Sequence, residues 1–399
     1  MKILLVNDYA TPTGGAEISM LALRDGLRRR GHDARLFASS ARPMQSGILA
    51  DYECFGTTTR YRTLLQAANP WAFWRFRGVL AEFQPDVVHV MMFLTQLSPL
   101  ILPLLREVPS LYHVQWYRPV CPVGTKMLPD GTACQVPAGL VCYRNRCLPL
   151  RDWLPLMFQM RLWRRWRNAF NVIVANSEAV RRRLIDEGLE PVEVVFNGVP
   201  LQPPRPPLSS SPAVAFAGRL VREKGVDVLL RAFARVVTEV PTARLLLVGD
   251  GPERERLTKL TAELGLSATV SMLGHLSREQ LDRVYAVAWV QCVPSRWAEP
   301  FGMVAAEAMM RGTAVVASGC GGLTEIVQDG GTGILVPPGD AEALAEALLR
   351  LLRNRELAEQ MGRAGRELAL ARFSEGSFVD RFEQLHQELY QKSLKANGN

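Results

Sequence analysis

The stretch Ala213-Val214-Ala215-Phe216-Ala217-Gly218-Arg219-Leu220-Val221-Arg222-Glu223-Lys224-Gly225 decides the fold of the second half of the chain. Its apolar start predicts a strand over 213–217, a loop bounded by glycines follows, and a helix is predicted to begin near Val226. Strand, loop and helix in this order form the repeating unit of a parallel sheet covered by helices. The unit recurs downstream, with strands predicted at 244–248, 269–273, 290–294, 314–318 and 333–336.

The first half of the chain shows the same alternation. Strands are predicted at 2–7, 33–38, 87–91, 110–114, 171–175 and 192–196. Between the halves, residues 200–212 hold six prolines and three serines, which sustain neither a helix nor a central strand. The sequence therefore predicts an α/β protein with Rossmann-like domains at 1–199 and 213–372, a linker at 200–212 and a helical segment at 373–399. Two such domains that face each other leave a cleft at the carboxyl ends of their strands, where ligands bind.

Composition narrows the class of protein further. The 399 residues include 47 Lys and Arg against 39 Asp and Glu, a net charge of +8, and 48% are hydrophobic, which excludes a disordered or collagen-like chain. The longest apolar stretch, 91–105, falls short of the roughly 20 residues that span a bilayer, and the amino terminus is too briefly apolar for a signal peptide. These features predict a cytoplasmic protein. Nucleic-acid binding is not expected, because the arginines come with neither an aromatic stacking platform nor a groove-reading motif.

Two glycine-rich loops are candidate anion sites. Gly14 and Gly15 lie just before a predicted helix, where small residues let the backbone approach a ligand, although a tight turn alone also explains them. Arg219 and Lys224 are five residues apart in a loop that ends at a helix amino terminus, so both can reach one diphosphate. The alternative is a surface loop with two exposed cations.

Two carboxylates follow in the second half. The segment Gly249-Asp250-Gly251-Pro252 closes one strand with a glycine-rich turn. After the strand at 290–294, Glu299 is expected on a loop and Glu307 on the next helix, so that both face one ligand site. Carboxylate oxygens accept hydrogen bonds from sugar or ribose hydroxyl groups. The alternative is one solvated glutamate and one on a helix face.

Together these motifs resemble the family-four retaining glycosyltransferases of the GT-B fold. The resemblance rests on Gly14-Gly15-Ala16-Glu17, Gly218-Arg219-Leu220 with Glu223-Lys224-Gly225, Gly249-Asp250-Gly251-Pro252, and Glu299 to Glu307 with Pro300-Phe301-Gly302. It implies two Rossmann-like domains facing across a cleft, and a C-terminal helix that crosses back to the first domain. It also implies a donor-binding set consisting of Gly14, Gly15, Gly218, Arg219, Lys224, Gly249, Glu299, Phe301, Gly302 and Glu307.

The resemblance implies a reaction as well. A sugar moves with retained configuration from a nucleotide-diphosphate sugar to a hydroxyl acceptor held by the first domain, a lipid-linked or saccharide precursor of cell-surface polysaccharide. Arg219 and Lys224 hold the diphosphate, Glu299 contacts the sugar, Glu307 binds the ribose, and no metal is required. A nucleotide-sugar epimerase and a catalytically silent nucleotide-binding protein stay as alternatives. A phosphorylase of this fold is disfavoured, because with Lys224 assigned only Lys259 remains in the core of the second domain to hold pyridoxal phosphate.

One position departs from the family pattern. Where the subgroup with a cysteine-containing loop commonly has His-Asp-Tyr-Arg, this chain has Gln115-Trp116-Tyr117-Arg118. His113 lies two residues earlier on the same face of an extended strand. His113 is therefore a candidate catalytic residue that takes over the sugar contact, and a core histidine is the alternative.

Four cysteines mark the loop at 119–149. Cys121, Cys134, Cys142 and Cys147 stand in a segment rich in proline and glycine and poor in hydrophobic residues, which a structural zinc ion could organise. No Cys-x-x-Cys pair is present. Disulfides and reduced thiols are the alternatives, and a reducing compartment disfavours the disulfides.

The segment 150–167 interleaves tryptophan with arginine. On a predicted helix, Trp163, Trp166 and the neighbouring arginines are typical of an interfacial segment, with the rings at headgroup depth and the cations on anionic lipid. Peripheral contact with an anionic membrane is expected on this interpretation. A core helix with solvated arginines is the alternative.

Overall fold

The chain folds into two compact units. The computed structural model describes residues 1–12, 14–41, 47, 49–59, 61–208 and 211–397. Unit 1 comprises 1–130, 134–198 and 375–399, and unit 2 comprises 131–133 and 199–374. The chain thus leaves unit 1 after Gly198 and returns to it at Glu375. Ser209 and Ser210 of the predicted linker lie outside the described residues.

Unit 1 is built on a seven-stranded parallel sheet with the order β3-β2-β1-β4-β5-β6-β7. Every residue of β4, β5 and β6 is buried, as expected for strands covered on both faces. The edge strand β3 was not expected from the sequence. The strands are β1 (Lys2–Asn7), β2 (Asp33–Ser39), β3 (Tyr52–Cys54), β4 (Val87–Val90), β5 (Ser110–Val114), β6 (Val172–Ala175) and β7 (Val192–Val194).

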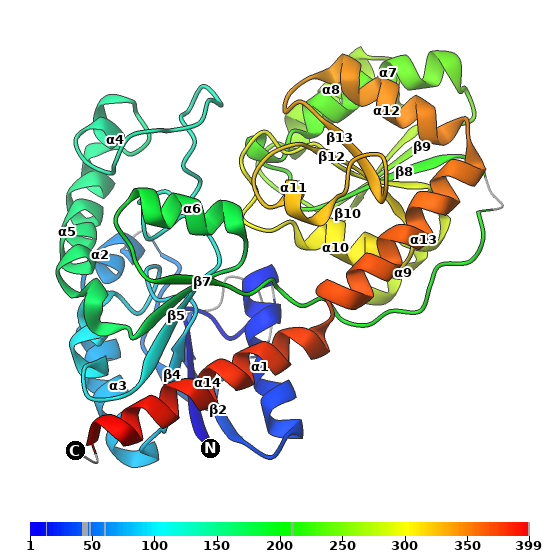
Figure 1. The fold of residues 1–399 in the computed structure, drawn as a ribbon. Coiled ribbons are helices and arrows are strands. Elements are labelled where there is room, and N and C mark those ends of the chain that lie inside the picture. Colours follow the sequence, from blue (N-terminus) through cyan, green and yellow to red (C-terminus); the bar gives the residue numbers. More distant parts are fainter. Residues whose placement is uncertain (13, 42–46, 48, 60, 209–210, 398–399) are drawn as a thin grey trace. The chain divides into compact units, whose positions relative to one another are not determined.

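Helices cover this sheet, and the last helix of the chain is one of them. Figure 1 shows α14 (Glu375–Asn397) lying beside α1 (Gly15–Arg29), and the two pack against each other. Phe378 and Phe382 of α14 are buried in one cluster with Leu5 of β1. The predicted return of the C-terminal helix to the first domain is confirmed. The other helices of unit 1 are α2 (Arg62–Ala67), α3 (Pro70–Phe83), α4 (Val141–Arg144), α5 (Leu150–Trp166) and α6 (Glu178–Asp186), with 3₁₀ helices η1 (Pro99–Leu105) and η2 (Arg167–Ala169).

Unit 2 has a six-stranded parallel sheet with the order β10-β9-β8-β11-β12-β13. Its strands are β8 (Ala213–Ala217), β9 (Arg244–Val248), β10 (Val270–Gly274), β11 (Val290–Val293), β12 (Ala314–Ser318) and β13 (Gly333–Val336). Its helices are η3 (Arg222–Lys224), α7 (Val226–Glu239), α8 (Arg254–Glu263), α9 (Arg278–Val287), α10 (Met303–Met310), α11 (Leu323–Ile326), α12 (Ala341–Leu352) and α13 (Arg355–Arg372). Two parallel α/β units confirm the predicted fold class.

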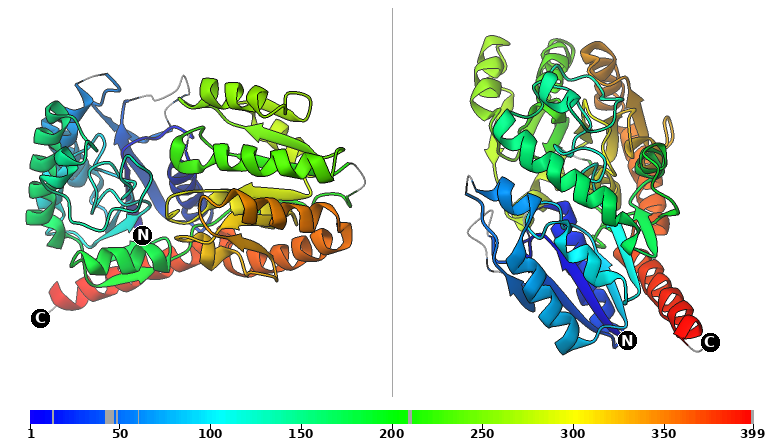
Figure 2. Two further views of the ribbon diagram at one scale, coloured as in Figure 1. Left: turned by 90° about the horizontal axis from the view of Figure 1, so that it is seen from above. Right: turned by 90° about the vertical axis from the view of Figure 1, so that its left-hand side faces the viewer.

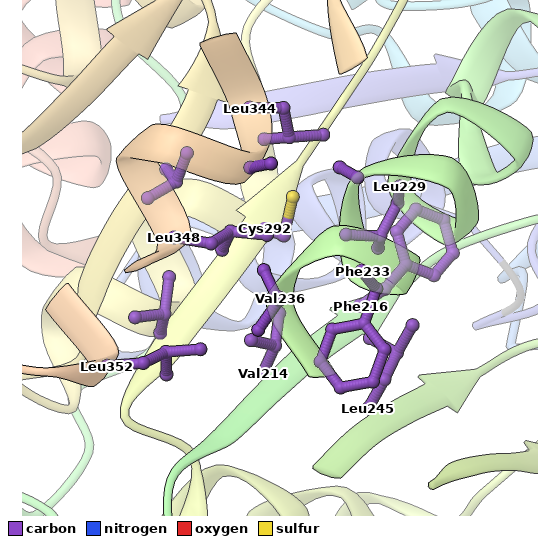
Figure 3. Close-up of a cluster of buried hydrophobic side chains, with 14 of the residues drawn as sticks. Val214, Phe216, Leu229, Phe233, Val236, Leu245, Cys292, Leu344, Leu348 and Leu352 are labelled. Atoms are coloured by element: carbon purple, nitrogen blue, oxygen red, sulfur yellow. The ribbon is translucent and has the colours of Figure 1, made fainter. Parts of the chain in front are cut away.

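The core of unit 2 lies between its sheet and the helices α7 and α12. Leu229, Phe233 and Val236 recur at helical spacing on α7, and all three are fully buried. Figure 3 shows them converging with leucines of α12 over the strand residues Phe216 and Cys292. Removing a buried ring such as that of Phe233 costs about 3–5 kcal/mol in comparable cores. This packing buries β8 inside the sheet, between β9 and β11.

Candidate functional site

The strand order of unit 2 predicts where a ligand binds. The chain runs from the central strand β8 outward to β9 and β10, then crosses to β11 on the other side of β8. The loops that leave the carboxyl ends of β8 and β11 therefore diverge, and in such sheets ligands bind in the crevice at this point. Lys224 follows β8 and Glu299 follows β11. Both residues singled out from the sequence thus stand at the switch point.

The loops after β8 and β9 are packed backbone against backbone. Gly218 directly follows β8, and its amide donates to the Val248 carbonyl at 3.0 Å. Gly249 has φ +126°, and a Cβ at Gly249 would lie 1.9 Å from the Gly218 carbonyl oxygen. The Leu220 amide also donates to the Asp250 carbonyl at 2.9 Å. Glycine at 249 is required by both its conformation and this close approach.

Gly225 joins the loop after β8 to the loop after β11. It adopts a left-handed conformation, φ +66°, at the amino terminus of α7. A Cβ at this position would lie 2.0 Å from the carbonyl oxygen of Pro294. The Arg296 amide donates to the Glu223 carbonyl at 2.8 Å beside it. The two loops therefore touch where α7 begins, and the positive end of the helix dipole makes that position favourable for an anion.

A lysine and a buried glutamate form the centre of the candidate site. The Lys224 ammonium lies 2.6 Å from Oε1 of Glu299, whose side chain is only 7% exposed. The hydroxyl of Ser295 donates to the same oxygen at 2.5 Å. The Lys224 ammonium also lies 5.7 Å from the centre of the Trp297 ring. Lys224 and Ser295 thus compensate the desolvation of the Glu299 carboxylate and fix its orientation.

The backbone around Glu299 is held by the next loop. The Gly322 amide donates to the Glu299 carbonyl at 2.7 Å, and the Cys320 thiol donates to the Trp297 carbonyl at 3.1 Å. Phe301 is buried, packing 5.7 Å from the Phe373 ring, so it anchors the loop. Gly302 is the residue that caps the amino terminus of α10.

The other two charged candidates are placed differently. The Arg219 side chain is 77% exposed, and its guanidinium lies 4.0 Å from the Glu223 carboxylate. Glu307 lies on α10, partly buried, and its backbone carbonyl accepts from Arg311 at 3.0 Å. The structure therefore brings Lys224 and Glu299 into direct contact, leaves Arg219 extended at the surface, and sets Glu307 on the helix that begins at Gly302.

The corresponding switch point of unit 1 lies between β1 and β4, and the sequence reasoning missed its key residue. The Asp8 carboxylate, directly after β1, accepts backbone hydrogen bonds from Thr95 at 2.8 Å, Gln96 at 2.6 Å and Leu97 at 3.0 Å. Burial raises the pKa of Asp8, and these hydrogen bonds oppose the shift. Asp8 thus ties the loop after β1 to the loop after β4. An acidic residue directly after the first strand was the signal in the sequence.

Gly14 and Gly15 lie at the beginning of α1, after the loop that follows β1. Gly14 is the N-cap residue, and Gly15 is the first residue of the helix. A Cβ at Gly14 would lie 2.5 Å from Oε2 of Glu17. Burial raises the pKa of Glu17 to about 7, and the negative charge of Asp8 adds to the shift. Glu17 is therefore a largely desolvated carboxyl group in the first turn of α1.

His113 does not lie at an open edge of the sheet. It is fully buried, and its ring centre lies 4.6 Å from that of Phe382 on α14. Burial lowers the pKa of His113 to about 3. Its Nε2 lies 2.7 Å from Nε2 of Gln115, and that amide also donates to Asn197 at 3.0 Å. This placement differs from the expected sugar contact, because the returning helix covers the histidine.

The four loop cysteines lie in one region but do not form a metal cage. Cys121 and Cys142 are buried, Cys134 and Cys147 are partly exposed, and all are free thiols. Burial and then the three neighbouring thiols raise the pKa of Cys147. Across the described residues, no group of three or more His, Cys, Asp or Glu side chains is arranged to hold a metal ion. Zinc stays a prediction from the sequence, to be decided by elemental analysis together with titration of the thiols.

The structure also corrects the expectation for the tryptophans of α5. Trp163 is only 1% exposed, and its indole Nε1 donates to the Pro119 carbonyl at 2.9 Å. Trp166 is partly buried. Trp163 therefore belongs to the core, because it lies on the face of α5 that packs toward the sheet. The exposed side chains of this helix are Leu150, Arg151, Leu154, Phe158, Arg161, Arg164 and Arg165.

Two family models match the chain in succession. Residues 13–203 match the model described as Glycosyltransferase Family 4, and residues 203–368 match the model described as Glycosyl transferases group 1. The two matches together extend from residue 13 to residue 368. They place this two-unit chain among the group 1 glycosyltransferases.

Known proteins agree with this classification. The chain is 36% identical over 230 residues to a D-inositol 3-phosphate glycosyltransferase of Nocardioides, covering 50% of each chain. It is 32% identical over 182 residues to an alpha-D-kanosaminyltransferase of Streptomyces kanamyceticus, covering 46% of this chain and 47% of the relative. These alignments thus span about half the length of the relatives.

Solved structures match over nearly the whole chain. A sucrose-phosphate synthase of Thermosynechococcus elongatus superposes with a TM-score of 0.77 at 25% identity, covering 98% of this chain and 100% of that one. HepE of Anabaena in complex with UDP-glucose superposes with a TM-score of 0.71 at 20% identity, covering 97% of this chain and 100% of that one. The second likeness is one of fold alone.

Proposed function

We propose that the protein transfers a sugar from a nucleotide-diphosphate sugar to a hydroxyl acceptor. The observation that carries the proposal is the pair of Lys224 and Glu299, joined at 2.6 Å where the loops after β8 and β11 meet the amino terminus of α7. A cation and a helix amino terminus suit a diphosphate, and a fixed carboxylate suits sugar hydroxyls. The UDP-glucose complex of the HepE neighbour supports a donor of this class.

In this proposal the cations bind the leaving diphosphate. Lys224 stands at the start of α7, and Arg219 extends from the same loop with 77% of its side chain exposed, so it is able to turn toward a ligand. Each charge-assisted contact to phosphate contributes about 1.5–3 kcal/mol. Glu307 follows on α10 and binds the ribose hydroxyls of the nucleotide.

The carboxylate of Glu299 orients the sugar rather than attacking it. Its Oε1 already accepts from Lys224 and Ser295, which stabilises the anion and lowers its nucleophilicity. The bond from the anomeric carbon to the diphosphate breaks while the acceptor oxygen bonds to the same face. The acceptor proton passes to an oxygen of the departing diphosphate, so configuration is retained without a protein nucleophile or a metal ion. Lys224 stabilises the charge that develops on the diphosphate.

The acceptor is proposed to bind unit 1, near the loops after β1 and β4 that Asp8 ties together. A lipid-linked or saccharide precursor of cell-surface polysaccharide is the proposed class. One relative supports a lipid: a GDP-mannose-dependent phosphatidylinositol monomannoside mannosyltransferase of Mycobacterium tuberculosis is 35% identical over 172 residues, 42% of this chain and 45% of the relative.

The test combines product analysis with one variant. Glu299→Gln keeps the size of the side chain and removes its charge, so turnover should fall by about 10²-fold while no covalent sugar adduct forms in either protein. Glu255→Gln is the matched control, because this exposed glutamate of α8 pairs only with Lys259 among the described ion pairs. Product NMR should show the anomeric configuration of the donor, with EDTA present.

Other results would refute the proposal in identifiable ways. An inverted product, or a sugar adduct on Glu299 by mass spectrometry, would contradict the mechanism. Release of an epimerised nucleotide sugar without an acceptor would identify an epimerase. Binding of a nucleotide sugar with no turnover over a broad acceptor panel would identify a silent binding protein.

A further inference from the structure

The outer surface of unit 1 exposes large apolar side chains on three helices. Trp71 and Trp74 of α3 are 56% and 62% exposed, although tryptophan is usually mostly buried. Leu64 of α2 and Leu154 and Phe158 of α5 are exposed to a similar degree. We call the following six residues the aromatic face: Tyr61, Leu64, Trp71, Trp74, Leu154 and Phe158.

These side chains come from elements that are joined to one another. Helices α2 and α5 pack together, and the Thr63 hydroxyl of α2 donates to the Asp152 carboxylate of α5 at 3.1 Å. Helix α3 begins three residues after α2 ends, capped by the Asn69 side chain. Figure 1 and the right-hand view of Figure 2 show α5 on the outside of unit 1, with α2 next to it. The aromatic face is therefore carried by two helices that pack together, α2 and α5, and by α3, which follows α2 directly in the chain.

The exposed side chains are not core residues that failed to find a partner. Helix α3 buries Phe76, Val79 and Phe83 on its other side, and α5 buries Leu156, Met160 and Trp163. Each helix therefore already has an apolar face toward the core and carries a second one toward solvent. A second apolar face is costly for an isolated protein in water and marks an interaction surface.

Positive charge accompanies the aromatic face. Helices α2, α3 and α5 together contain seven arginines and two acidic residues. On α5 the exposed side is apolar at Leu154 and Phe158 and becomes cationic at Arg161, Arg164 and Arg165 toward the helix end. On α3 the Arg77 guanidinium lies 5.6 Å from the Trp74 ring. The surface thus combines amphipathic rings with a cationic border.

We propose that the aromatic face docks unit 1 onto an anionic lipid bilayer. Tryptophan and tyrosine rings favour the headgroup region, leucine and phenylalanine reach the acyl boundary, and arginines bind anionic headgroups. Among the described residues no helix is long and apolar enough to cross a membrane, so the contact is peripheral. The docking proposal rests on the proposed function in one respect. Docking would bring the enzyme to a lipid-linked acceptor.

The experiment measures flotation of the full chain with vesicles of phosphatidylcholine alone and of phosphatidylcholine mixed with phosphatidylglycerol. The wild type should bind the mixed vesicles, and added salt should weaken the binding. Trp71→Ser/Trp74→Ser should lower the affinity at least about tenfold, because both rings leave the interface. Arg161→Gln/Arg165→Gln should lower it for the mixed vesicles only.

Matched controls use exposed apolar residues elsewhere. Leu201→Ser and Leu273→Ser remove side chains that are 68% and 38% exposed in unit 2, and both should bind vesicles like the wild type. All the substituted side chains are exposed, so folding should be preserved, and circular dichroism checks this. Equal flotation of the wild type and the tryptophan variant would overturn the proposal.

Two further outcomes separate this proposal from its rivals. A dimer in light scattering that Trp71→Ser/Trp74→Ser converts to a monomer, without vesicle binding, would assign the face to a second copy of the chain. Calorimetric binding of UDP, GDP or ADP tests the donor site independently, because Trp71 and Trp74 lie in unit 1. Vesicle binding with no nucleotide binding would uphold the docking face and contradict the proposed function.

Discussion

Lys224 and Glu299 are 75 positions apart in the chain and in contact in the fold. Both were predicted as site residues from the sequence, because each lies in a loop that follows a predicted strand. Ser295 was not named, although it lies in the Glu299 loop and donates to the same carboxylate oxygen. A serine four residues before a buried glutamate has no distinctive pattern, so only the folded loop reveals it.

His113 shows the opposite case, because its residue type suggested a sugar contact and the structure packs it in the core with two further histidines. His89, His113 and His386 are all fully buried, where β4 and β5 meet α14. Nδ1 of His89 lies 3.1 Å from Nε2 of His386, a distance that suits one ring donating to a neutral partner. Burial lowers the pKa of His113 and of His386 to about 3, and that of His89 well below its usual value.

These shifts predict an acid-sensitive contact between α14 and the sheet. All three histidines have lower pKa values in the folded state than in the unfolded state, so stability is fully present above about pH 6.5 and falls as the pH drops below it. Each histidine adds about one bound proton to the slope of the unfolding free energy against pH. Glu17 has the opposite effect on stability, because its pKa is raised to about 7 in the folded state. Its contribution therefore favours the folded state as the pH falls through about 7. Near His386, the Glu383 carboxylate pairs with His32 and Arg30, which lower its pKa. The stability that this pairing contributes is lost only at more acid pH.

Hydrogen exchange in β5 and α14 between pH 7 and pH 5, corrected for intrinsic rates, measures this stability. The local free energy of opening should fall with pH, and His386→Gln should reduce the slope by about one proton. The comparison of slopes does not depend on how much the substitution itself destabilises the protein. An unchanged slope in the variant would show that His386 is not neutral in the fold.

At the scale of elements, the sequence predicted the strands well where they are central. The predicted strands at 2–7, 213–217, 244–248 and 314–318 match β1, β8, β9 and β12, because a strand buried on both faces is a continuous apolar run. The edge strand β3 has only three residues, too few for any periodicity. Helix α5 is apolar on two sides, so periodicity could not tell that Trp163 faces inward.

The turn at Gly225 gives a prediction at this scale. Gly225 and Gly265 have nearly equal φ angles, +66° and +69°, but a Cβ at Gly265 would meet nothing within 4 Å. Gly265→Ala should therefore cost only the backbone strain, about 1–2 kcal/mol. Gly225→Ala should cost more than about 3 kcal/mol, because its Cβ also displaces the loop at Pro294.

Urea unfolding of the two variants measures the difference. Gly225→Ala should also weaken binding of a nucleoside diphosphate, whereas Gly265→Ala should bind like the wild type. Equal stability and equal binding in the two variants would mean that the contact between the loops after β8 and β11 does not shape the site.

At the scale of the whole molecule, the chain builds the same kind of unit twice and closes the first with its last helix. The sequence pattern could predict both sheets, because strand and helix alternate in each half. It could not show that α14 covers His113, because that contact joins residues far apart in the chain. The sequence therefore could not show that His113 is buried, whereas Lys224 and Glu299 lie at the switch point of a single unit.

The central claim is that unit 2 binds a nucleoside diphosphate through Lys224, and calorimetry tests it most directly. UDP, GDP and ADP are titrated into the wild type, Lys224→Ala and Lys259→Ala, the last being an exposed lysine of α8 paired with Glu255. At least one nucleotide should bind the wild type, and Lys224→Ala should raise its dissociation constant at least about tenfold, since one charge-assisted phosphate contact is lost. Lys259→Ala should bind like the wild type. Equal affinity in Lys224→Ala and the wild type, or no binding of any of the three nucleotides, would contradict the account.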